Sequence, residues 1–247
     1  MNLSDQASAK MCRWTVAGAA VKAGLAMALC GFVQAQAQQA TSSCGSLGKP
    51  FGDYLIDKDK VALSERFHFT PEVESLIRGK SSERIGADID FMLINYPNHH
   101  RALLAMMRLG EKVKSQQPNG ATYSVECYFD RALRFRPDDV VARMLYATFL
   151  SRNERAAEAS TQLELVNKAD PDNPFTQYNV GLIYLDMKNY DKALEQAHKA
   201  YELGFGRTEL RDRLKSAGHW TDPEPGVTTN PGSNPSVAPG NPASAAN

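Results

Sequence analysis

The amino-acid sequence predicts an all-α protein built from helical hairpins. Equivalent small and apolar positions recur after 34 residues within residues 140–205. Helix-start signals occur at the right places, such as Asn173 followed by Pro174, where the amide can cap the first turn and the proline fits the first helical position. Proline also recurs at the ends of successive segments, at Pro97, Pro137 and Pro171.

Residues 1–37 have the layout of a cleaved export signal. Basic residues precede a short apolar stretch, residues 23–33, whereas a stable membrane-spanning helix needs about 20 apolar residues. Ala35 and Ala37 end two small-x-small sites, which suit signal peptidase. The alternative is an uncleaved N-terminal anchor, but the regular alanine pattern favours cleavage. We therefore expect an exported, periplasmic protein without a stable membrane span after cleavage.

The charge balance argues against nucleic acid as a partner. The chain has 28 Lys and Arg residues and 28 Asp and Glu residues. Cleavage of the signal removes three basic residues and one acidic residue, so the net charge changes from +0 to −2. A nucleic-acid-binding domain would instead be strongly basic, because it must displace counterions from the phosphates.

The cleaved chain keeps two cysteines, Cys44 and Cys127. In an exported protein this suggests one disulfide, with two unpaired thiols as the alternative. The bond would close a loop of 84 residues, for which the chain-entropy model gives about 4 to 5 kcal/mol of stabilisation. No Cys-x-x-Cys motif or close Cys/His spacing is present. We expect no metal and no cofactor.

The N-terminal part of the cleaved chain has weaker signals. Residues 38–69 match no motif, and we interpret them as an extended segment. Thr70 followed by Pro71 indicates a helix start, and Gly79 is a suitable helix end. A second helix is expected over residues 82–95, where apolar residues share one face. The two would form an N-terminal hairpin, either a degenerate repeat or a cap.

The next hairpin is expected to carry an insertion. Residues 99–112 predict a first helix with Ala105 as its central small residue, and residues 126–137 predict the second helix. The separation of the two helices is eight residues longer than in the following repeats. We expect a lengthened first helix followed by a turn at residues 118–120, Pro-Asn-Gly, which is a strong helix-breaking sequence.

The two following units carry the clearest repeat pattern. Residues 173–205 resemble the tetratricopeptide (TPR) consensus, and residues 140–171 fit the same register. Two positions depart from the family pattern, because Ala197 is smaller than usual and Phe205 replaces the closing proline. The matching residues are Val180, Gly181, Tyr184, Tyr190, Ala193 and Ala200 in the second unit, and Tyr146, Ala147, Leu150, Ala159, Leu163, Val166 and Pro171 in the first.

The resemblance implies a TPR-like α-α superhelix over residues 70–220. It would contain about three helical hairpins, the N-terminal hairpin and a C-terminal capping helix over residues 208–217, whose sequence is polar. Residues 221–247 carry six prolines and no aromatic residue, so we expect a disordered tail. A polyproline ligand or a spacer is the alternative reading of that tail.

The resemblance also implies where a partner would bind. In TPR proteins the first helices of the hairpins line a concave groove that holds a protein or peptide. Only one of the implied groove positions is basic, so the groove differs from those that grip a chaperone's terminal carboxylate. The alternative is that Phe175 and Leu182 pack against the capping helix. The groove residues are Met144, Thr148, Arg152, Phe175, Tyr178, Leu182 and Asp186, flanked by Val141, Ser151 and Leu185.

No familiar catalytic motif occurs in the sequence. His99 and His100 are adjacent, so on a helix they point about 100° apart and cannot share a metal ion; we expect capping or surface roles. Asp88 and Asp90 face different directions and are expected to be solvated.

We therefore expect a non-enzymatic scaffold or adaptor for a cell-envelope protein or peptide. The first alternative is a structural accessory subunit of an envelope complex. The second is an enzyme of unknown class, with its catalytic group near residues 112–123 or 44–69.

Overall fold

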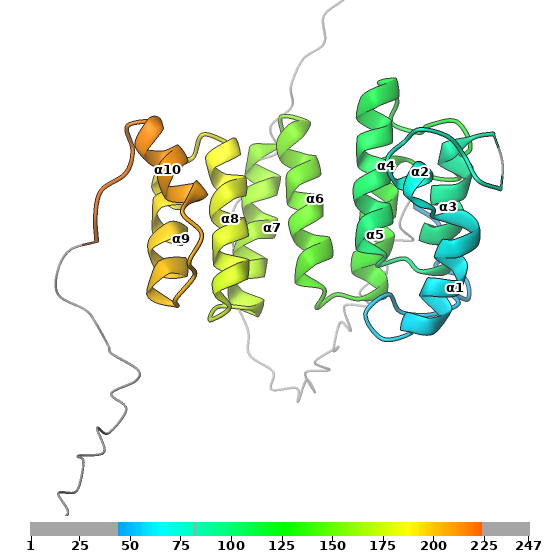
Figure 1. Cartoon of the computed structure of the whole chain (residues 1–247), viewed down its shortest axis with the longest axis horizontal. Coiled ribbons are helices and arrows are strands. Elements are labelled where there is room, and N and C mark those ends of the chain that lie inside the picture. Colours follow the sequence, from blue (N-terminus) through cyan, green and yellow to red (C-terminus); the bar gives the residue numbers. More distant parts are fainter. Residues whose placement is uncertain (1–43, 82, 224–247) are drawn as a thin grey trace, which may run out of the picture. The chain divides into compact units, whose positions relative to one another are not determined.

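The computed structural model describes residues 44–81 and 83–223, which belong to one compact unit. Their regular structure consists of ten α-helices, packed largely against their neighbours in the chain (Figure 1), and contains no strand. This confirms the all-α prediction. The expected signal, residues 1–37, and residues 224–247 of the expected tail lie outside the described residues. The helices are α1 (Lys58–His68), α2 (Pro71–Glu74), α3 (Ile85–Asn95), α4 (His100–Val113), α5 (Val125–Phe135), α6 (Val140–Arg152), α7 (Ala156–Ala169), α8 (Pro174–Asp186), α9 (Tyr190–Glu202) and α10 (Glu209–Ser216).

The two clearest predicted repeats form the hairpins α6–α7 and α8–α9, as expected. Each pair is joined by a tight connection, with Glu154 and Lys188 in the left-handed conformation at φ 61° and 59°. Asn173 caps α8 by accepting a hydrogen bond from the Phe175 amide, and Pro174 is the first helical residue. Most of the predicted small and apolar positions are almost fully buried, whereas Tyr146 and Tyr190 are half-buried and Pro171 is exposed. The almost fully buried positions include Ala147, Ala159, Leu163, Val166, Val180, Tyr184, Ala193 and Ala200.

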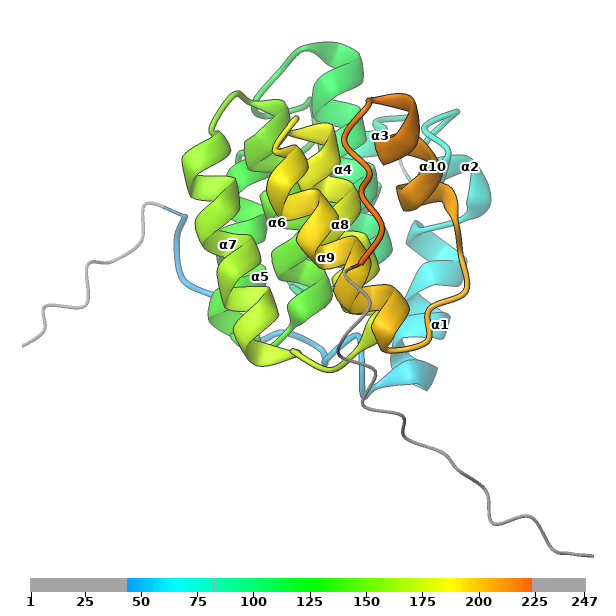
Figure 2. The same ribbon diagram turned by 90° about the vertical axis from the view of Figure 1, so that its left-hand side faces the viewer.

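Gly181 allows the closest approach between helices in the last hairpin. A Cβ atom at this residue would lie 2.5 Å from Cδ2 of Leu210 and 3.3 Å from Cβ of Gln196. Leu210 belongs to α10, which packs against both α8 and α9 (Figure 2). Leu210 and Leu214 are buried while the rest of α10 is polar. The predicted C-terminal capping helix is therefore confirmed, and its packing depends on the missing side chain at Gly181.

The insertion between α4 and α5 packs against α3. The turn near residues 118–120 is present, but α4, with 14 residues, is only one residue longer than α6 and α8, so most of the extra residues lie in the connection between α4 and α5. A Cβ atom at Gly86 would lie 2.4 Å from the Asn119 carbonyl oxygen, so the turn rests on the backbone of α3. Thr122 donates to the Asp90 carboxylate from its amide, at 3.0 Å, and from its hydroxyl, at 2.9 Å. The extra residues thus cover α3.

The N-terminal part differs from the prediction in two ways. The segment expected to be extended contains α1, whose Val61 is buried. Long-range contacts, described below, hold this helix, and they leave no local pattern in the sequence. The helix expected from Pro71 to Gly79 is only the short α2, because Leu76 adopts φ 58° and the Ile77 amide bonds back to the Glu72 carbonyl.

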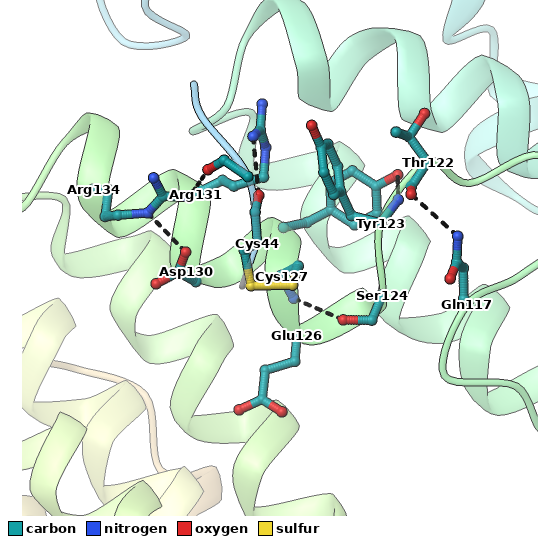
Figure 3. The surroundings of a disulfide bond; sticks show 12 residues. Cys44, Gln117, Thr122, Tyr123, Ser124, Glu126, Cys127, Asp130, Arg131 and Arg134 are labelled. Atoms are coloured by element: carbon teal, nitrogen blue, oxygen red, sulfur yellow. Dashed lines mark hydrogen bonds and ion pairs between the residues drawn. A yellow bond between two sulfur atoms is a disulfide. The ribbon is translucent and has the colours of Figure 1, made fainter. Parts of the chain in front are cut away.

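A disulfide joins Cys44 to Cys127 on α5, as predicted (Figure 3). Beside it the Arg131 side chain is 2% exposed and donates to the carbonyl oxygens of Cys44, at 3.3 Å, and Ser46, at 2.5 Å. The Arg131 guanidinium also lies 4.3 Å from the centre of the Tyr123 ring. The covalent bond and the buried arginine together fix the start of the described chain on α5.

We predict that Gly181→Val lowers the free energy of unfolding by about 1 to 3 kcal/mol, because the new methyl groups would overlap Leu210 and force α10 away. Chemical denaturation measures the change. Gly206→Val is the matched control, since nothing lies within 4 Å of the position of its Cβ atom. Equal effects of the two changes would contradict the packing of α10 on α8.

We predict that Cys44→Ser/Cys127→Ser lowers the free energy of unfolding by about 4 to 5 kcal/mol, the chain-entropy value for a loop of this length. Reduction of the wild-type protein should have the same effect in thermal melts. The double variant should no longer respond to reductant. If the double variant has the same melting temperature as the oxidised wild-type protein, the disulfide does not stabilise the fold.

Candidate interaction groove

The predicted groove residues on α6 are mostly occupied by contacts within the chain. Met144 is 6% exposed and belongs to the core. The Thr148 hydroxyl donates to the Met144 carbonyl oxygen at 2.9 Å. Arg152 reaches across to α4 and pairs with Glu111 at 2.9 Å, while both side chains stay about half exposed. Of these three predicted groove residues, only Arg152, at the end of the helix, is exposed.

The predicted groove residues on α8 divide into buried and accessible ones. Tyr178 is 2% exposed, and its ring centroid lies 4.4 Å from that of Phe205. Leu182 is half-buried against the core that includes α10. Phe175 remains 53% exposed, although its ring meets Phe205 edge-on at 6.3 Å. Asp186 pairs with Arg213 of α10 at 2.6 Å.

Leu182 fits the alternative of packing against the capping helix, whereas the ring contact of Phe175 is with Phe205 in the connection before α10. Leu182 is partly covered, whereas more than half of the Phe175 side chain can still contact a partner. The register did not identify three contacts of the groove residues: Glu111 and Arg213, which come from neighbouring units, and Phe205, which closes the unit of Phe175 and Tyr178. The sequence marks Phe205 as a departure from the family pattern, because an aromatic residue replaces the usual proline, but it does not show that the ring contacts Phe175 and Tyr178.

A cleft of about 460 Å³ lies where the insertion replaces a tight turn. The end of α4, the start of α5 and the end of α6 surround it. One carboxylate in it is compensated: Glu126 accepts hydrogen bonds from the Tyr146 hydroxyl, at 2.8 Å, and from Arg155, at 2.7 Å. Burial and this carboxylate raise the pKa of Tyr146. The walls include Met107, Gly110, Gln116, Val125, Phe149 and Asn153.

The adjacent histidines have separate structural roles. His99 caps α4, and its Nδ1 accepts a hydrogen bond from the Ala102 amide at 3.1 Å. The proton must therefore lie on Nε2, which donates to Glu65 of α1 at 2.9 Å. His99 is fully buried, and burial lowers its pKa despite the carboxylate. His100 pairs instead with Asp139 at 2.8 Å. The capping role is confirmed for His99.

Asp88 and Asp90 are buried, at 1% and 9% exposure, so the expectation that they are solvated is wrong. The Asp88 carboxylate accepts hydrogen bonds from the amides of Lys80 and Ser81 at 2.7 Å and 3.1 Å. Asp90 holds the insertion through Thr122. Adjacent loops, which the helical spacing alone does not reveal, cover both carboxylates.

We predict that the free energy of unfolding falls as the pH drops below about 6.5, the ordinary pKa of histidine. The lowered pKa of His99 means that the unfolded chain takes up a proton first, at a cost of up to about 1.4 kcal/mol per pH unit. His99→Asn replaces the capping Nδ1 with an amide oxygen, which can also accept from the Ala102 amide, and should flatten the pH dependence between pH 7 and 5. The control is His219→Asn, at an exposed position near α9, which should leave the pH dependence unchanged.

Comparison with known proteins identified no relative: no family model, curated protein or solved structure matches the chain. Within residues 44–81 and 83–223, no group of His, Cys, Asp and Glu side chains could hold a metal ion. No helix in the same residues is long and apolar enough to cross a membrane. The likeness to TPR proteins therefore rests on the residues and on the helical hairpins they form.

Proposed function

We propose that this protein is an exported, TPR-like scaffold that binds a protein or peptide of the cell envelope along helices α6 and α8. The observation that carries the proposal is Phe175, a large aromatic side chain that is 53% exposed on the first helix of the clearest repeat. Rigid aromatic side chains lose little conformational entropy on binding and are enriched among interface anchors. The proposed mode of action is binding, without a cofactor or a chemical step.

The surroundings of Phe175 support an apolar anchor site. The Phe205 ring packs edge-on against Phe175 and in a tilted arrangement against the buried Tyr178. These contacts hold the Phe175 side chain in place. A side chain held in this way needs little ordering when a partner binds. We propose that an apolar side chain of the partner packs against the exposed face of Phe175.

Two exposed ion pairs add a polar component to the proposed surface. Arg152 pairs with Glu111, and Asp186 pairs with Arg213, each between helices of neighbouring units. Exposed pairs of this kind contribute only about 0 to 1 kcal/mol, so a charged partner can replace one member at little cost. The balance of two acidic and two basic groups favours a peptide of mixed charge.

The export part of the proposal rests on the signal-like layout of residues 1–37 and on the disulfide. Disulfides persist in oxidising compartments such as the periplasm and are rare in the cytosol. The bond between Cys44 and Cys127 is therefore compatible with export.

A structural accessory subunit is the second candidate. Met144 and Tyr178, two of the implied groove residues, are buried in the core and serve the fold. If the other positions also serve only packing, the helices would hold a larger complex together without a peptide groove.

We predict that Phe175→Ala reduces capture of an envelope partner at least tenfold, the effect of losing about 1.4 kcal/mol of binding free energy. The measurement is a crosslinking pull-down from an envelope extract with the wild-type and variant chains at equal concentration. Leu165→Ala is the matched control, because Leu165 on α7 is 43% exposed but lies outside the proposed surface.

Thermal melts must show that both variants remain folded. Tyr178→Ala is unsuitable, since loss of a buried aromatic side chain costs about 3 to 5 kcal/mol of stability. A partner captured equally by wild type, Phe175→Ala and Leu165→Ala would refute the groove and favour the accessory role.

A further inference from the structure

Exposed apolar side chains in the described part of the chain are concentrated near its start. Six of the ten large ones lie within residues 51–77, and the other four are spread over residues 113–203. Leu63 and Phe67 on α1 are each 56% exposed. Large exposed apolar groups that gather in one region usually mark an interaction surface. The six are Phe51, Leu55, Ile56, Leu63, Phe67 and Ile77.

Contacts on the inner face of α1 fix which side chains point outward. Val61 is 3% exposed and belongs to the core. Ser64 bonds to the Tyr96 hydroxyl at 2.9 Å, and Glu65 bonds to His99 at 2.9 Å. Because α1 is held on this side, Leu63 and Phe67, which are four residues apart, form one apolar stripe on the opposite side.

Two unpaired charges of opposite sign flank this stripe. Asp59 and Arg66 are exposed, and neither has an ion-pair partner among the described residues. They are seven residues apart, so they lie on the same flank of α1, with Leu63 between them along the helix. The acidic group is near the start of the helix and the basic group near its end. This arrangement is self-complementary when a second identical helix runs in the opposite direction.

We propose that α1 is a self-association surface, on which two copies of this chain pack α1 against α1 in antiparallel orientation about a twofold axis. Leu63 of one copy would contact Leu63 of the other, and each Phe67 would pack beside the partner's Leu63. A twofold axis perpendicular to the plane of the two helices places the same flank of each helix on the same side of the pair. Asp59 of each copy therefore faces Arg66 of the other. At a rise of about 1.5 Å per residue, these charges lie about 6 Å and 4.5 Å from the level of Leu63, which places them opposite each other.

The size of the surface sets the strength of the association. One pair of 11-residue helices buries less than the roughly 1,600 Å² of a standard stable interface. The dimer is therefore weak and forms reversibly at high concentration. It leaves α6 and α8 uncovered, so it is independent of the proposed groove.

Sedimentation of the full chain, expressed for export, tests the dimer over about 1 µM to 1 mM, the range in which weak complexes dissociate. We expect reversible monomer–dimer exchange that Leu63→Glu abolishes and that Leu165→Glu, a matched change on α7, leaves intact. A chain that stays monomeric throughout, or a dimer that tolerates Leu63→Glu, overturns the proposal.

A charge-exchange experiment tests the antiparallel arrangement. Asp59→Arg places two arginines opposite each other, and Arg66→Asp places two aspartates opposite each other, so each variant alone should dimerise at least tenfold more weakly than wild type. In an equimolar mixture, the arginines of the first variant face the aspartates of the second, so dimerisation should recover. A folding defect cannot produce this recovery. If the mixture associates no better than either variant alone, the proposed pairing is wrong.

Discussion

The buried carboxylate of Asp139 joins three parts of the chain on which the rest of the helical packing depends. It caps α6 by accepting from the Ala142 amide at 2.9 Å, and it accepts from His100 of α4 at 2.8 Å. Asn98 donates to it at 3.2 Å and also to Asp53 of the N-terminal segment at 3.0 Å. Burial alone would raise the pKa of Asp139, but these donors lower it below its usual value. The ionised group thus sets the position of α4 relative to α6.

The same hydrogen bonds explain why the N-terminal segment is part of the fold. The Tyr54 amide donates to the Asn98 side chain at 3.0 Å, and Asp53 also pairs with Arg136 at the end of α5. Loss of one partner would leave buried polar groups unsatisfied, at a cost of about 1 to 3 kcal/mol each. Together with the disulfide, these bonds tie residues 44–57 to two later helices.

The predictable part of the fold is the part governed by local spacing. Helices α6 to α9 follow from the 34-residue register because close packing within a hairpin needs small residues, such as Ala147 and Ala193, at fixed positions. The first helix does not follow from any such rule. Its orientation depends on Ser64 and Glu65 reaching Tyr96 and His99, more than thirty residues away.

The candidate groove was predictable only in outline for the same reason. The register identifies which side chains share a face, but burial depends on what covers that face. Tyr178 is buried because Phe205, in the connection after α9, packs on its ring. Arg152 pairs with Glu111 because α4 and α6 pack against each other, which the spacing within either helix does not reveal. Glu111 belongs to the unit before the one that supplies Arg152, and Phe205 closes the unit that supplies Tyr178 at a position where the family pattern has proline.

The terminal helices at the two ends of the helical unit differ in whether their apolar side chains are buried. At the C-terminal end α10 turns Leu210 and Leu214 inward and presents charged residues outward, as a terminal cap of a repeat protein must. At the N-terminal end α1 buries Val61 but leaves Leu63 and Phe67 outside. The bonds of the N-terminal segment hold this apolar stripe in place, so a partner that covers it has little ordering entropy to overcome. A pair of chains joined at α1 would carry two copies of the Phe175 surface, which raises the avidity for any partner that offers two binding segments.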